Sequence, residues 1–153
     1  MPTVYDVPAD QLIQRMAAYL RENALDVSPH PLAALVKTSP QLENPPESPD
    51  FWYVRCASIL RKLYINKFVG IDELRKAYGG RWGGRGDVGK HKRRSGGAMI
   101  RLCLKQLETA GLVKIVAGRG RTLTNKGVAT LDTLSNEILK NLVKDVPELK
   151  KYE

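Results

Sequence analysis

The chain has 153 residues, a formal net charge of +9 and a sequence pI of about 9.7, and this length suits one domain that buries a core without disulfides. Two cysteines are too few for a disulfide framework, no apolar run is long enough for a membrane span, and no charged leader precedes an apolar stretch. We therefore expect an intracellular protein with no membrane segment, and the basic excess favours a polyanionic partner.

The first elements along the chain are a helix and a proline-rich segment. Residues 8–25 place their apolar side chains on one face, which predicts an amphipathic helix. Six prolines within residues 28–49 exclude a long helix there. We expect an ordered or semi-ordered surface excursion, with room for a short helix around residues 31–37.

A central amphipathic helix is predicted to begin at Ser48, which can cap it while Pro49 occupies the first turn. A short helix over 71–78, closed by two glycines, follows it. Cys56 and Cys103 fall on apolar helix faces, so we expect buried free thiols rather than metal ligands. The apolar seam of the central helix consists of Trp52, Cys56, Ile59, Leu60 and Leu63.

The segment 79–97 is different in kind, with eight glycines, six Lys or Arg residues and a single acid. Its small apolar surface cannot offset the entropy of ordering, so we expect a mobile basic loop in the free chain. The segment superficially resembles a phosphate-binding loop, but no strand precedes it and no Ser or Thr follows Lys90. The sequence has no metal-ligand cluster and no paired carboxylates, so we expect neither an enzyme nor a cofactor.

The remaining elements predict a winged-helix layout. Ser95 is expected to cap a third helix that ends at Gly111, and two short strands over 112–116 and 122–124 flank a glycine-rich basic tip. A last helix over 128–142 precedes a polar tail, residues 144–153, which we expect to fray. The predicted fold is mainly α: a winged helix-turn-helix core around the central amphipathic helix, with a β-hairpin wing and an N-terminal helical extension, in a single domain of residues 1–143.

Positive charge is concentrated in the middle of the chain. Residues 51–126 carry eighteen basic and four acidic side chains, a net +14, whereas the flanking segments have net charges of −4 and −1. Like charges repel one another, so solubility alone gives no reason to gather them. Lys and Arg neutralise phosphates, and glycine lets the backbone approach a sugar-phosphate chain. We favour nucleic-acid contact over the plainer interpretation of a solvated charged surface.

Candidate contacts follow from this charge and from the helix faces. Tyr53 lies off the apolar seam and could stack on unpaired bases, whereas Trp52 is expected in the core. Arg101 and Lys105 lie one turn apart on the exposed face of the third helix, where a recognition helix would contact its partner. The full set of candidate RNA-binding residues is Tyr53, Arg55, Arg61, Lys62, Arg81, Arg85, Lys90, His91, Lys92, Arg93, Arg94, Arg101, Lys105, Arg119 and Arg121.

Three runs of sequence resemble a known family. They are "PDFWYVRCASILRKLYINKFVGIDELRKAYGGR" from Pro49, "SGGAMIRLCLKQLETAGLV" from Ser95 and "GRGRTLTNKGVATLDTLSNEI" from Gly118. Together they are similar to the small-subunit ribosomal protein S19e family of archaea and eukaryotes, over residues 3–142. The resemblance implies a winged-helix core, a place in the head of the small subunit, rRNA binding and a need in subunit maturation. It also implies RNA-facing positions at Arg55, Arg61 and Arg81, and on the central helix.

Two departures from the family pattern limit what can be carried over. Members usually show a proline followed shortly by tryptophan where this chain has Pro29-His30-Pro31-Leu32. The basic, glycine-rich loop also lacks the usual proline, so its charge is carried over but not its geometry.

We therefore expect a structural constituent of the small ribosomal subunit, located in the cytoplasm on the ribosome. Its partners would be ribosomal RNA and neighbouring proteins of the subunit head, with no membrane and no small-molecule substrate. One alternative is a winged-helix transcription regulator, but among base-reading amides the third helix offers only Gln106. Another is a protein-interaction module with incidental charge, which would bind its partner independently of salt.

Overall fold

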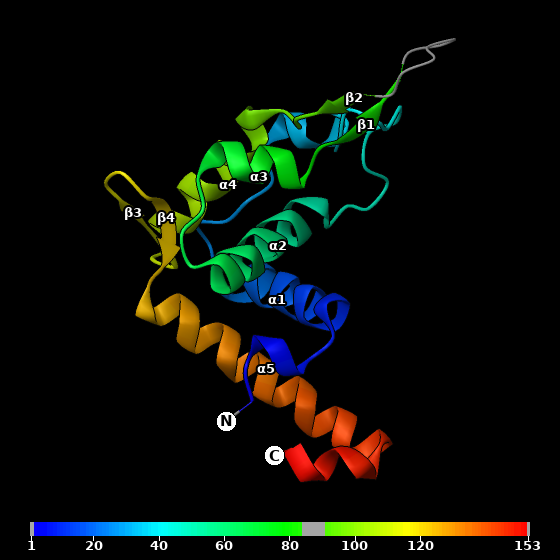
Figure 1. The fold of residues 1–153 in the computed structure, drawn as a ribbon, viewed down its shortest axis with the longest axis vertical. Coiled ribbons are helices and arrows are strands. Elements are labelled where there is room, and N and C mark those ends of the chain that lie inside the picture. The colour runs from blue at the N-terminus through cyan, green and yellow to red at the C-terminus, as the bar shows by residue number, and fades with distance from the viewer. Residues whose placement is uncertain (1, 84–90, 153) are drawn as a thin grey trace.

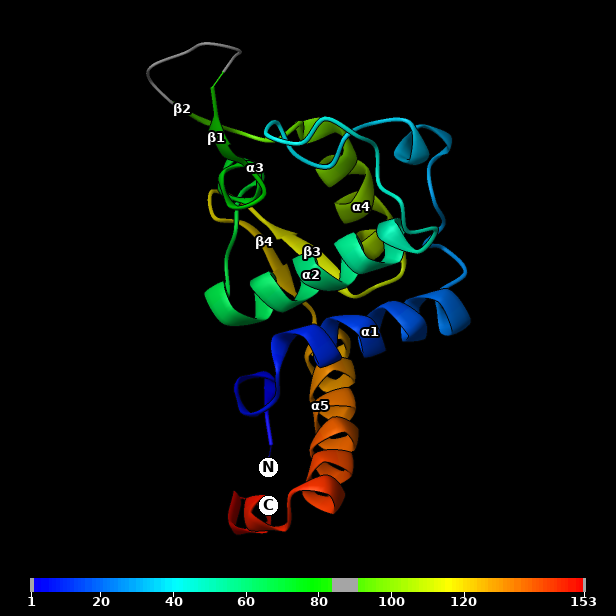
Figure 2. The same ribbon diagram turned by 90° about the vertical axis from the view of Figure 1, so that its right-hand side faces the viewer.

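The computed structural model describes residues 2–83 and 91–152 and is mainly helical. Helix α2 lies at the centre, where it packs against α1, α4, α5 and strand β4 (Figures 1 and 2). In chain order the elements are η1 (Val4–Asp6), α1 (Ala9–Asn23), η2 (Pro31–Ala34), α2 (Phe51–Asn66), α3 (Ile71–Ala77), β1 (Gly80–Trp82), β2 (His91–Arg93), α4 (Gly97–Thr109), β3 (Val113–Val116), β4 (Gly120–Leu123), α5 (Asn125–Asp145) and η3 (Pro147–Tyr152).

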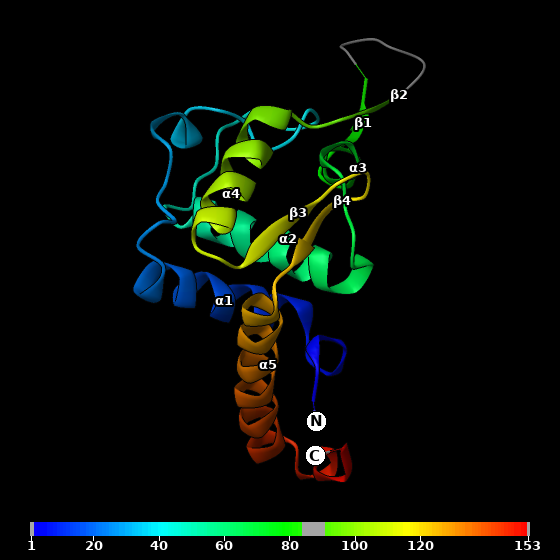
Figure 3. The same ribbon diagram turned by 90° about the vertical axis from the view of Figure 1, so that its left-hand side faces the viewer.

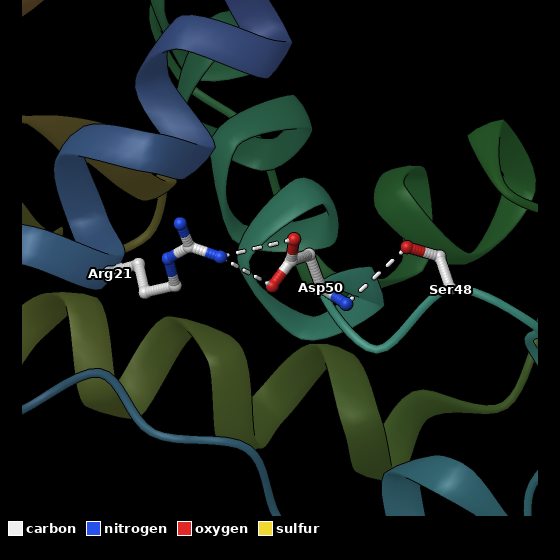
Figure 4. A network of polar contacts seen from close by, with 3 residues as sticks. All are labelled: Arg21, Ser48 and Asp50. Atoms are coloured by element: carbon white, nitrogen blue, oxygen red, sulfur yellow. Dashed lines mark hydrogen bonds and ion pairs between the residues drawn. The ribbon is translucent and has the colours of Figure 1, made fainter.

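The central amphipathic helix is confirmed, because its whole predicted apolar seam is buried. Its predicted cap is wrong: Asp50, not Ser48, is the N-cap residue. The Ser48 hydroxyl instead accepts a hydrogen bond from the Asp50 N–H at 3.3 Å, which closes a local turn before the helix. Arg21 of α1 donates to both carboxylate oxygens of Asp50, at 3.2 and 3.3 Å (Figure 4). This ion pair joins the end of α1 to the start of α2.

The winged-helix arrangement is also confirmed. Helices α2, α3 and α4 precede an antiparallel hairpin, β3–β4, which forms the wing. Val69, between α2 and α3, exchanges two backbone hydrogen bonds of 3.0 Å with Arg121 of β4, so a short third segment pairs with the wing. As expected, α4 stops at Gly111, whose φ of +78° suits a glycine after a helix end.

The basic segment between α3 and α4 contains regular structure that the sequence did not predict. Strands β1 and β2 pair as an antiparallel hairpin, so the predicted loop assignment is wrong for residues 80–82 and 91–93. The two strands meet closely at their base, where a Cβ on Gly79 would collide with the carbonyl oxygen of Arg93. Of the predicted loop sites, Arg85 and Lys90 lie outside the described residues.

Ser95 anchors the end of this hairpin and does not cap α4, contrary to the sequence prediction. The N-cap residue of α4 is Gly96. The Ser95 N–H donates to the Arg75 carbonyl at 2.9 Å, and the Ser95 carbonyl accepts from Arg75 Nε at 2.8 Å. These two bonds fix the start of α4 against α3.

The short helix expected in the proline-rich segment is confirmed, whereas the C-terminal tail is more ordered than expected. The proline-rich segment contains one short helix, η2, and Ser39 within it is buried and donates from its hydroxyl to the Tyr78 carbonyl at 3.0 Å. Helix α5 starts at Asn125 and runs away from the body (Figure 2). The polar tail, expected to fray, forms η3 and packs against α5.

Both cysteine thiols are buried and unpaired by disulfide, as predicted. Cys56 and Cys103 are each 0% exposed. A hydrogen bond to Cys103, together with burial, raises the pKa of the Cys56 thiol well above its ordinary value. The two thiols therefore behave as small apolar side chains between α2 and α4.

Candidate nucleic-acid interface

The β1–β2 hairpin presents several basic side chains to solvent. Arg81 and Lys92 are exposed and lie directly opposite each other across the two strands. His91 and Arg93 are exposed on β2 as well. The Arg93 guanidinium carbon lies 3.8 Å from the centroid of the Trp82 ring, a cation–π contact. The hairpin thus carries cations on both of its faces.

Helix α4 and the wing add further exposed cations. Arg101 and Lys105 are exposed one turn apart on α4, as predicted. Arg101 folds back along the helix, since a Cβ on Gly97 would lie 3.1 Å from its Nη1. Arg119, at the tip of the wing, is exposed, and its guanidinium carbon lies 5.4 Å from the centroid of the Phe68 ring.

These three elements occupy the same half of the molecule. Figure 3 shows α4 beside the β3–β4 hairpin, with the β1–β2 hairpin at the same end of the long axis and the free end of α5 at the other. The described acids of residues 51–126 have other partners: Asp72 pairs with Arg94 at 2.5 Å, Glu108 pairs with Arg121 of β4, and Glu73 accepts from the Gly70 N–H at 3.1 Å. Among the described residues, none of these three acids forms a salt bridge with an exposed cation of the hairpin, of α4 or of the wing tip.

One of the predicted RNA-binding residues of the wing, Arg121, forms an ion pair within the protein. Arg121 is half-buried, and its Nε lies 2.6 Å from a carboxylate oxygen of Glu108 on α4. The two side chains are only 19% and 24% exposed, so this ion pair is better shielded from water than the others of the described chain. It braces the wing against α4.

The basic side chains of α2 are more buried than the sequence suggested. Arg55 is half-buried, with its guanidinium carbon 3.9 Å from the Tyr78 ring centroid and 5.1 Å from that of Phe51. It also donates to the Thr38 carbonyl at 3.4 Å. Burial lowers the pKa of Arg55 from its ordinary value, and nearby Tyr78 partly opposes this shift. Arg55 therefore holds the proline-rich segment and α3 together.

The other predicted residues of α2 are half-buried too. Tyr53 packs against the core, and Lys62 Nζ lies 5.3 Å from the Tyr78 ring centroid. Arg61 Nε is buried and has no hydrogen-bond partner among the described residues. RNA contact by these three side chains stays a prediction, and the exposed set lies on the hairpin, α4 and the wing.

Sequence reasoning missed Trp82. It is half-buried on β1, yet it does not pack against the hydrophobic core, unlike Trp52, which is 1% exposed as expected. The signal was present in the sequence, because an aromatic residue interleaved with glycines and arginines is typical of surfaces that bind nucleic acid.

Two classes of site are absent from the part of the chain that the structure describes. Residues 2–83 and 91–152 contain no group of three or more His, Cys, Asp or Glu side chains arranged to hold a metal ion. No helix in those ranges is long and apolar enough to cross a membrane.

Comparisons with known proteins identify the family. The family model for ribosomal protein S19e matches residues 3–141. The chain is 48% identical over 153 residues to small ribosomal subunit protein eS19 of Aeropyrum pernix, covering 99% of both chains. It is 39% identical to the protein of that name from Haloarcula marismortui, again over 99% of both chains. With that of Oryza sativa it shares 33% identity, over 89% of this chain and 92% of the other.

These matches confirm the resemblance seen in the sequence. They also confirm the predicted non-enzymatic, structural role in the small ribosomal subunit and the predicted location on the ribosome in the cytoplasm. The fold, the basic surface and the comparisons agree, and the chain belongs to the ribosomal protein S19e family.

Proposed function

We propose that this protein binds ribosomal RNA in the head of the small subunit, and that this binding is required for subunit assembly and rRNA maturation. Neighbouring ribosomal proteins of the head would be its other partners. The observation that carries the proposal is a set of exposed basic side chains that form no salt bridge among the described residues: Arg81, His91, Lys92, Arg93, Arg101, Lys105 and Arg119.

The proposed mechanism is electrostatic docking onto a rigid frame. Each cation that neutralises a phosphate releases condensed counterions, which supplies affinity without reading sequence. The cations lie on three separate elements: α4 packs on α2 and α3, strand β4 of the wing packs on α2, and the β1–β2 hairpin is tied to α3 by the Ser95–Arg75 hydrogen bonds. A folded RNA whose phosphates match this spacing would therefore be preferred over a uniform duplex.

Salt dependence tests the proposal. The double variant Arg81→Ala/Lys92→Ala removes two cations from the hairpin, and Lys140→Ala/Lys144→Ala removes two exposed lysines from α5 as a matched control. For binding to rRNA of the small-subunit head, the first pair should flatten the plot of log K against log salt by roughly 0.7 to 0.9 for each phosphate that is no longer neutralised. The control pair should leave the slope unchanged. Equal slopes for both double variants and the wild type would refute the proposed interface.

Assembly is tested in cells depleted of the native protein. The α5 control variant should restore mature small subunits, whereas the hairpin variant should leave precursor rRNA unprocessed and fewer small subunits on a gradient. Full rescue by the hairpin variant would separate RNA binding from assembly and contradict that part of the proposal.

The transcription-regulator alternative loses the one base-reading amide of its third helix. Gln106 accepts a hydrogen bond from Trp52 Nε1 at 2.7 Å, and its own amide donates to the Ser28 carbonyl at 2.9 Å. An amide used in this way is not available to an adenine edge. A competition assay discriminates directly, because a regulator would prefer a specific duplex DNA to structured rRNA. A protein-interaction module would instead show no salt dependence.

A further inference from the structure

The two faces of the β1–β2 hairpin carry different chemistry. In its register, Arg81 lies opposite Lys92 and Trp82 lies opposite His91. Because side chains alternate between the faces of a strand, Arg81 and Lys92 share one face, while Trp82, His91 and Arg93 share the other. The first face offers one guanidinium and one ammonium group, and the second offers flat rings beside a guanidinium plane.

The second face is held by packed elements. The Arg75 carbonyl and Nε both bond to Ser95, at 2.9 and 2.8 Å, which fixes the chain just after β2. A Cβ on Gly80 would lie 2.5 Å from the Gln41 side chain, so the proline-rich segment sits against the base of β1. These contacts anchor the base of the hairpin next to Trp82 and Arg93, and an anchored site is suited to binding a flat group.

Trp82 is not explained by the packing of the fold. It is outside the hydrophobic core, and its ring faces the Arg93 guanidinium at 3.8 Å. Tryptophan rings and arginine planes are two side-chain surfaces on which unpaired nucleobases stack, and a paired base inside a helix presents no free face to them.

We propose that the Trp82–Arg93 pair is a stacking site for an unpaired nucleobase of the bound RNA, while Arg81 and Lys92 contact its phosphates. This inference rests on the proposed function and adds to it the class of RNA: a loop or bulge, rather than a continuous helix, at the hairpin. Stacking of this kind tolerates any base, because every base has a π face.

The test uses two short RNA stems that are identical except that one is fully paired and the other carries a single additional, bulged 2-aminopurine. Wild-type protein should bind the bulged stem more tightly and should quench the 2-aminopurine fluorescence on binding. Trp82→Ala should weaken binding of the bulged stem by roughly 5- to 150-fold, the range expected when one base no longer stacks, and should abolish the quenching. It should leave binding of the paired stem and the salt slope unchanged.

Two further variants keep the test decisive. Trp82→Phe retains a ring and should keep most of the quenching, which shows that the hairpin still folds. Arg81→Ala should lower the salt slope but preserve the quenching, since Arg81 lies on the other face. If wild type binds both stems equally, or if Trp82→Ala still quenches, the stacking site is wrong while RNA binding stands. If wild type binds neither stem in a salt-dependent way, the proposed function falls and this inference with it.

Discussion

Replacing Gly120 by alanine probes the join between the wing and the helical core. Gly120 has a φ of +94°, and a Cβ on it would lie 2.7 Å from the carbonyl oxygen of Val69. Gly118, two residues earlier in the same hairpin, has a φ of +75° but nothing within 4 Å of its Cβ position. The two substitutions therefore share the backbone strain and differ in the close approach to Val69.

The expected losses of stability follow from these two situations. A non-glycine residue at positive φ costs about 1–2 kcal/mol, offset by about 0.4–1 kcal/mol from the lower entropy of the unfolded chain. Gly118→Ala should thus lower the free energy of unfolding by about 1 kcal/mol. Gly120→Ala must in addition push Val69 away and weaken its two hydrogen bonds to Arg121, at about 0.5–1.5 kcal/mol each. We expect a total loss of about 2–4 kcal/mol.

Urea unfolding followed by far-UV circular dichroism measures both losses in the same two-state framework. A difference of at least about 1 kcal/mol between the variants is expected, with the same m value. Equal losses would mean that the pairing of Val69 with β4 contributes nothing to stability, and that the wing is not tied to the core through this segment.

Three further outcomes are expected. Glu108→Gln should lower the free energy of unfolding by about 1–2 kcal/mol, because it leaves the half-buried Arg121 of β4 without its carboxylate partner. A thermal melt unchanged from wild type would contradict a stabilising role for this ion pair. Cys56 and Cys103 should both resist a thiol reagent such as dithionitrobenzoate in the native protein and both react after unfolding, since each is 0% exposed; rapid reaction of either native thiol would contradict their burial. Gly79→Ala should disrupt the β1–β2 hairpin and change the tryptophan signal in near-UV circular dichroism, because its Cβ would collide with a backbone carbonyl. Gly96→Ala should leave that signal unchanged, since the space around Gly96 is open. Identical spectra for the two variants would argue against the hairpin.

The helical frame could be predicted from the sequence because burial there follows a simple period. The seam from Trp52 to Leu63 repeats at helical spacing, and all five of its members are buried. The wing was equally predictable, since Gly111 ends α4 and glycines mark the hairpin tip. Each of these features depends on residues close together in the chain.

The β1–β2 hairpin escaped prediction because its strands have no strand-forming pattern. Gly-Arg-Trp and His-Lys-Arg contain no β-branched residue and no apolar alternation, and the pairing depends on the anchorage of Ser95 by Arg75. Ser48 and Ser95 failed as caps for a related reason: each serves a turn or an anchor whose partner the local sequence does not reveal.

The candidate interface could be predicted only in part. A basic side chain outside the apolar seam can either remain exposed to solvent or contact another side chain of the protein. Arg101 remains exposed, but Arg55 stacks on Tyr78 and Arg121 pairs with Glu108, and these partners are set by tertiary packing. A long side chain can bury its stem and its charge against such a partner. The sequence identified the basic segment, and the structure divided it into an exposed set and a bracing set.

Lysine reactivity in purified small subunits tests the central claim most directly. An amine-specific reagent is applied to the free protein and to intact subunits, and each lysine is quantified by mass spectrometry. Lys92 of the hairpin and Lys105 of α4 should react in the free chain, become protected in the subunit, and react again after ribonuclease digestion. Lys140 and Lys144 of α5 should show no such ribonuclease-dependent change. Unchanged reactivity of Lys92 and Lys105 on the subunit would contradict an RNA-binding role for this surface.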